Sequence, residues 1–198
     1  MNADGSAQTR LTENAATDNL PSISPDGTQV AFTSDRADNT DIWVMDIDGG
    51  GVTRLTLGGA VDQQPAWSPD GTKIAYSSTT GTGDFEIFVM NADGTGQTNI
   101  TGNEVVDDTN AAWSPDGLEI AFTSNRDGNN ELYRANADGS GEPVRLTNDP
   151  ADDHDPDWSP DGQKLAFYSD RPSAACCGSV WTINASDGSA ETNLTNAT

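Results

Sequence analysis

The chain has 198 residues, of which 33% are hydrophobic, and its 32 acidic and 9 basic side chains give a formal net charge of −23. A negative charge of this size repels phosphate backbones and anionic lipids, so we expect no nucleic acid partner. No apolar run approaches the roughly 20 residues that span a membrane, so we expect no membrane insertion either.

A Ser-Pro-Asp-Gly motif occurs four times along the chain, starting at residues 24, 68, 114 and 159. Proline presets the backbone of the second turn position and glycine accepts a positive φ, so each copy predicts a tight turn. The copies recur about every 45 residues, a period that indicates a repeat architecture. An apolar residue precedes each motif: Ile23, Trp67, Trp113 and Trp158.

Each motif is followed by the same succession of short apolar segments. They lie at 30–32, 74–76, 120–122 and 165–167, then at 42–43, 87–88, 132–133 and 180–181, and after a Gly/Asp turn at 55–56, 100–101, 146–147 and 194–195. Four short strands per unit without helical periodicity predict an all-β fold, a β-propeller of four-stranded antiparallel blades. Such a small sheet cannot bury both faces alone, so we expect the tryptophans and strand aromatics to pack between blades.

The expected blades span approximately residues 18–56, 62–101, 108–147 and 153–195 of a single propeller domain or propeller fragment, 1–198. Residues 1–12 repeat residues 90–101 almost position for position, which predicts one extra N-terminal fourth strand. We therefore expect the chain to be a piece of a larger protein. Residues 8–12 and 192–195 would compete for one blade edge, and a homo-oligomer that closes the ring is one expected outcome.

The succession W-S-P-D-G, I-A-F/Y-x-S, an aromatic strand, N-A-D-G-S/T-G and L-T resembles the WD-repeat-like units of TolB-type β-propellers over nearly the whole chain. The resemblance implies a periplasmic or secreted location. Related propellers include protein-binding modules, gating domains of serine peptidases and metal-dependent lyases, so the fold alone does not decide the function.

We interpret the chain as a non-catalytic scaffold that binds protein partners. Acid–base or nucleophilic catalysis needs a base beside a nucleophile, but the only histidine is His154 and no Gly-x-Ser-x-Gly elbow occurs. We assign no catalytic and no cofactor-binding residue. The alternatives are the accessory propeller of a prolyl-oligopeptidase-like serine peptidase and a cation-dependent carbohydrate-acting lyase.

One aspartate lies at the same distance before each Ile/Trp position: Asp18, Asp62, Asp108 and Asp153. Repetition predicts a ring of carboxylates on one face, accepting hydrogen bonds from loop N–H groups. Hard cations prefer several oxygen ligands. The fourth copy adds further carboxylates and is the candidate Ca²⁺ site, with the predicted ligands Asp152, Asp153, Asp155 and Asp157.

Two further features of the sequence are a repeated arginine and a pair of adjacent cysteines. Arg36, Arg126 and Arg171 end the second strand of three copies, and we expect each to pair with a carboxylate, such as the turn aspartate of an adjacent unit. Cys176 and Cys177 are adjacent, which excludes a zinc framework and leaves either a vicinal disulfide or two reduced thiols. Their loop is where we expect a partner-specific contact.

Overall fold

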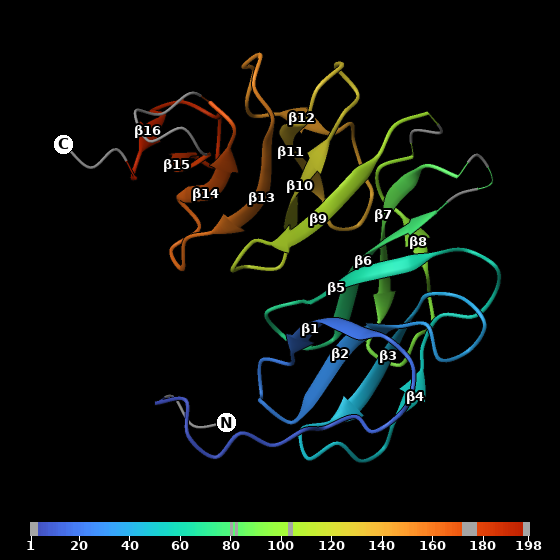
Figure 1. Ribbon diagram of the computed structural model, residues 1–198. Helices are drawn as coiled ribbons and strands as arrows, with labels where there is room; N and C mark the ends of the chain where they lie inside the picture. Colours follow the sequence, from blue (N-terminus) through green and yellow to red (C-terminus); the bar gives the residue numbers. More distant parts are fainter. Residues whose placement is uncertain (1–3, 80, 82, 103–104, 172–177, 196–198) are drawn as a thin grey trace.

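The computed structural model describes residues 4–79, 81, 83–102, 105–171 and 178–195. Its regular elements are strands, arranged in four antiparallel four-stranded sheets whose strands follow chain order. Figure 1 shows the sheets following one another around an arc. This confirms the predicted all-β architecture of propeller blades. Within the described ranges, no helix is long and apolar enough to cross a membrane.

The four sheets are called blades 1 to 4. Blade 1 consists of β1 (Asp18–Ile23), β2 (Gln29–Ser34), β3 (Asp41–Asp46) and β4 (Thr53–Arg54). Blade 2 consists of β5 (Asp62–Trp67), β6 (Lys73–Thr79), β7 (Phe85–Asn91) and β8 (Thr98–Asn99). Blade 3 consists of β9 (Asp108–Trp113), β10 (Glu119–Ser124), β11 (Glu131–Asn136) and β12 (Val144–Arg145). Blade 4 consists of β13 (Asp153–Trp158), β14 (Lys164–Ser169), β15 (Ser179–Asn184) and β16 (Thr192–Asn193).

The four Ser-Pro-Asp-Gly motifs form the predicted turns between the first two strands of each blade. In blade 2, the Gly71 N–H donates to the Ser68 carbonyl at 2.9 Å, and Gly71 has a φ of 70°. The Ser68 hydroxyl donates to Asp70 at 2.7 Å, and the Thr72 N–H donates to the same carboxylate at 2.9 Å. These hydrogen bonds hold the pKa of the Asp70 carboxyl below its usual value.

Neighbouring blades bury their apolar faces against each other, as the sequence predicted. Trp113 of blade 3 is 9% exposed and packs in one cluster with Ile87 and Val89 of blade 2. Its indole Nε1–H donates to the Ala66 carbonyl at 3.0 Å, so the ring is fixed by a hydrogen bond as well as by packing. Ile23, which holds the same position in blade 1, is 60% exposed.

The predicted extra N-terminal strand is not formed: residues 4–17 contain no strand. Leu11 nevertheless packs on blade 1, against Val30, Phe32 and Met45. Leu55 packs on the face of blade 2 in the same way. The N-terminal segment therefore lies where the fourth strand of a preceding blade would lie. It is not a strand because a strand needs a hydrogen-bonding neighbour, and no described strand lies beside it.

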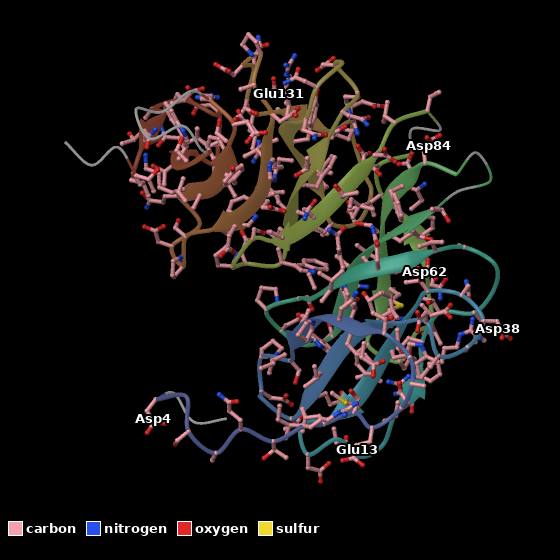
Figure 2. The ribbon with its side chains drawn as sticks, viewed as in Figure 1. Asp4, Glu13, Asp38, Asp62, Asp84 and Glu131 are labelled. Atoms are coloured by element: carbon pink, nitrogen blue, oxygen red, sulfur yellow. The ribbon has the colours of Figure 1, made fainter. Side chains whose placement is uncertain are left out.

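The four repeated aspartates open the innermost strand of each blade. Their carboxylates accept hydrogen bonds from a serine hydroxyl of the second strand, as Asp18 does from Ser34 at 2.6 Å, rather than from the loop N–H groups that we predicted. Most of this carboxylate set is buried. In Figure 2, Asp62 lies at the start of β5 within the fold, whereas Glu13 and Asp38 project from exposed loops.

Three arginines complete these clusters, and the predicted pairing of each arginine with a carboxylate is confirmed. The partner, however, is the aspartate of the arginine's own blade and not a turn aspartate of an adjacent unit. The distances are 2.7 Å for Arg36–Asp18, 2.8 Å for Arg126–Asp108 and 2.7 Å for Arg171–Asp153. The reason is register: Asp18 lies opposite Ser34, so an arginine two residues further on reaches it. Each guanidinium also lies over two aromatic rings of its blade.

Replacing Trp113 with alanine is expected to lower the free energy of unfolding by about 3–5 kcal/mol, because it removes a large side chain from between two blades. The matched control is Ile23→Ala in the same position of blade 1, which should change stability by no more than about 0.5 kcal/mol because Ile23 is exposed. Urea denaturation of both variants measures the two values. Equal losses would contradict the assignment of Trp113 to the core.

Two aspartates are expected to affect stability with opposite dependence on pH. Burial tends to raise the pKa of Asp18, but hydrogen bonds from Ser34, Arg36, Thr12 and Asn14 outweigh it and lower the pKa to about 2. The stabilisation by Asp18 is therefore complete above its usual pKa of 3.8 and is lost as the pH falls to about 2. For Asp108, burial raises the pKa against the hydrogen bonds of Ser124 and Arg126.

Urea midpoints of the wild type, Asp18→Asn and Asp108→Asn between pH 7 and pH 2 test this difference. The advantage of the wild type over Asp18→Asn should shrink below the usual aspartate pKa of 3.8. Its stability relative to Asp108→Asn should rise on acidification, because a carboxyl whose folded pKa is raised is stabilised by protonation. The same trend for both variants would show that the two carboxylates do not differ in this way.

Candidate functional site

The innermost strands β1, β5, β9 and β13 pack against each other along the inside of the arc (Figure 1). Each contains a β-bulge at the same place, where one non-glycine residue has a left-handed conformation. We call these four residues the bulge row: Leu20 (φ 50°), Gln64 (φ 58°), Asn110 (φ 58°) and Asp155 (φ 55°). Such conformations cost about 1–3 kcal/mol and persist only where the surroundings hold them.

Hydrogen bonds between blades hold the bulge row in place. The Gln64 N–H donates to Thr33 Oγ1 of blade 1 at 3.2 Å, and the Asp155 N–H donates to Thr123 Oγ1 of blade 3 at 3.3 Å. The Asn110 N–H donates to Oε1 of Gln64 in blade 2 at 3.4 Å. Each of these bulges is therefore anchored by the preceding blade, and the row depends on the assembly of the arc.

A pocket of about 280 Å³ opens over the bulge row and spans all four blades. Its walls are largely apolar, and its polar groups come from the row itself. The lining residues are Leu20, Pro21, Gln64, Pro65, Ala66, Asn110, Ala111, Asp155 and Pro156. An apolar concave surface with a few converging polar groups is the usual form of a ligand-binding site.

The polar end of the pocket lies at blade 4. The Asp155 side chain is 57% exposed, and its Oδ1 accepts a hydrogen bond from Nδ2 of Asn110 at 2.6 Å. Nδ1 of His154 lies 3.0 Å from Oδ2 of the same carboxylate, and the imidazole packs on the Tyr168 ring with centroids 4.7 Å apart. This arrangement can bind donor groups and cations through its acceptor oxygens.

A larger pocket of about 570 Å³ lies between blades 2 and 3, near the turns that precede their fourth strands. It is lined by Lys73 and Leu118 among others, and Nζ of Lys73 lies 3.4 Å from the side-chain oxygen of Asn91. Its lining comes from two blades only. We therefore regard the pocket over the bulge row, to which every blade contributes, as the candidate site.

The four predicted metal ligands lie in different environments. Asp152 Oδ1 accepts the Asn130 N–H at 2.8 Å, and Asp153 is buried against Arg171. Asp155 belongs to the bulge row, and Asp157 is exposed and is not among the residues that line the pocket. Within the described ranges, no group of three or more His, Cys, Asp or Glu residues is arranged to hold a metal ion.

Sequence reasoning missed Gln64 and Asn110 and included Asp155 for another reason. A signal was present, because aligned copies place Leu20, Gln64 and Asp155 directly before a proline at the same position. The proposed partner-contact loop with Cys176 and Cys177 lies outside the described residues.

Two family models match the sequence. A model of the TolB β-propeller domain matches residues 61–143, and a model of the tricorn protease N-terminal β-propeller domain matches residues 1–82. No curated protein sequence matches the chain significantly.

Several solved structures share the fold. TolB from Acinetobacter baumannii is 26% identical with a TM-score of 0.81, and the match covers 98% of this chain and 47% of that one. A TolB protein from Agrobacterium tumefaciens is 25% identical with a TM-score of 0.80, with 94% of this chain and 65% of that one covered. Oligogalacturonate lyase from Vibrio parahaemolyticus is 17% identical with a TM-score of 0.75, and the match covers 96% of this chain and 56% of that one. At this identity the likeness shows the fold alone.

This chain thus spans less than two thirds of the length of the TolB proteins that it matches. Its repeated motifs, its four blades and the family models agree with each other. The chain is thus similar to TolB-type β-propellers, in sequence over residues 61–143 and in fold over nearly its whole length.

Proposed function

We propose that this chain is a non-catalytic, protein-binding part of a larger extracytoplasmic protein. The observation that carries the proposal is the pocket over the bulge row, where two half-buried amides and the exposed Asp155 carboxylate lie among apolar residues. A groove of this kind suits an extended polypeptide segment, because its apolar lining offers contact area and its amides offer hydrogen bonds.

The non-catalytic part of the proposal is supported by how the charged groups are used. Asp108, Arg126 and Ser124 bind one another at the start of blade 3, which is a structural role. The contacts of His154 join it to a carboxylate and to the Tyr168 ring. Catalysis by a histidine base requires a nucleophile or substrate proton within hydrogen-bond reach of the ring.

The proposed location follows from the family. TolB-type propellers of the kind that the motifs resemble are proteins of the cell envelope, which supports a periplasmic or secreted place of action. The strongly acidic composition, with 32 Asp and Glu, gives the protein a charged, well-solvated surface. The puromycin hydrolase structure, at 20% identity, shares the fold alone. No feature of the described residues favours the second candidate function, the accessory propeller of a serine peptidase.

Binding is expected to be detectable with linear peptides. A library of random linear peptides displayed on phage, selected on the immobilised full chain, should enrich a shared motif that binds in solution. The reason is that the pocket is preformed by the hydrogen bonds between blades that hold the bulge row. Failure to enrich any motif over the bare support would contradict the protein-binding proposal.

The chain is expected to show no hydrolase or lyase turnover with ester, peptide or oligogalacturonate substrates. The measurement is product formation by the purified full chain, compared with His154→Ala and with a heat-denatured sample. Turnover that disappears in His154→Ala would overturn the non-catalytic proposal.

A further inference from the structure

We propose that the bulge row binds the basic side chain of an extended peptide, with the Asp155 carboxylate as its charged anchor. The inference rests on the proposed protein-binding function and names the chemistry that this site selects.

The first argument is the hydrogen-bonding capacity of Asp155. An ionised carboxylate offers about four lone-pair sites. Oδ1 receives the amide of Asn110 at 2.6 Å, and Oδ2 contacts His154 at 3.0 Å. Each oxygen thus has one of these neighbours and can accept a further donor. With 57% of the side chain exposed at the pocket, a lysine ammonium or an arginine guanidinium can approach both oxygens.

The second argument is the apolar wall beside the carboxylate. Pro156, Pro65 and Ala111 line the same pocket as Asp155. Lysine and arginine carry a long aliphatic stem below the charged head, and they place it along apolar surface while the head meets polar groups. An apolar lining that ends in an exposed carboxylate has the same distribution of polarity. An acidic or short polar side chain would use only one part of it.

The third argument is that the anchor is held before the ligand arrives. Asp155 is fixed in a left-handed conformation, with φ 55°, by its N–H bond to Thr123 of the neighbouring blade. The Asn110 amide fixes the direction of its carboxylate. A preorganised anchor lowers the entropy that binding must overcome. The field of the whole chain, with a formal net charge of −23, also attracts basic ligands.

The test is calorimetric titration of the full chain with an acetylated Gly-Ala-Arg-Ala-Gly amide and with the same peptide carrying neutral citrulline in place of arginine. The arginine peptide is expected to bind at least tenfold more tightly. Asp155→Asn should reduce this affinity at least tenfold, because it removes the anionic acceptor. Asparagine has nearly the same size and tolerates the left-handed conformation, so the fold should be retained. The urea midpoint checks this.

The matched control is Asp157→Asn, which changes the net charge equally on the same strand but outside the pocket. It should alter the affinity less than twofold. Equal losses for both variants would show that only the general field acts, and equal binding of the arginine and citrulline peptides would show that no cation is selected. Either result overturns the inference.

Failure here is distinguishable from failure of the proposed function. If the displayed library yields binding peptides that lack basic residues, the protein-binding role stands and the basic-side-chain inference falls. If the library yields no binder and the arginine peptide does not bind, both fall.

Discussion

The structure depends on one constraint: a four-stranded sheet of short strands has two apolar faces and cannot bury them without a neighbouring sheet. Blade 3 meets this constraint by placing Trp113 against Ile87 and Val89 of blade 2. Burial of apolar area is the largest favourable term in folding, at about 25 cal/mol per Å². The energy that holds a blade together therefore lies mostly at its contacts with adjacent blades, and each blade is stable only as part of the arc.

The same constraint explains where charge is placed. Asp108 is buried within blade 3, and desolvation of its carboxylate is tolerated because the Arg126 guanidinium lies 2.8 Å away. Arg126 also packs over the rings of Phe122 and Tyr133, so it joins the apolar contact as well as the ion pair. Replacing one partner would leave a buried charge unpaired. These clusters are thus part of the packing between strands, which agrees with a structural role.

The sequence predicted the four sheets well, because turn signals such as Ser68-Pro69-Asp70-Gly71 and the strands after them are local features that recur. It could not predict which carboxylate Arg126 would bind, since the partner is chosen by the register of two strands. It also could not predict the conformation of Gln64. The proline that follows disfavours the right-handed helical region, but the left-handed conformation is held by Thr33 of another blade. The sequence likewise could not predict that the segment around Leu11 would pack where a fourth strand lies without forming a strand itself.

The bulge row combines a repeated backbone with side chains that are not repeated. Its four φ angles lie between 50° and 58°, yet the side chains change from Leu20 through two amides to Asp155. The backbone geometry of the last three positions is held by hydrogen bonds from their backbone N–H groups to the preceding blade, so it does not require the same side chain in every blade. A ligand lying across the row therefore meets an apolar group at blade 1 and a carboxylate at blade 4. Because the row differs at its two ends, it can fix the direction of a bound peptide as well as its position.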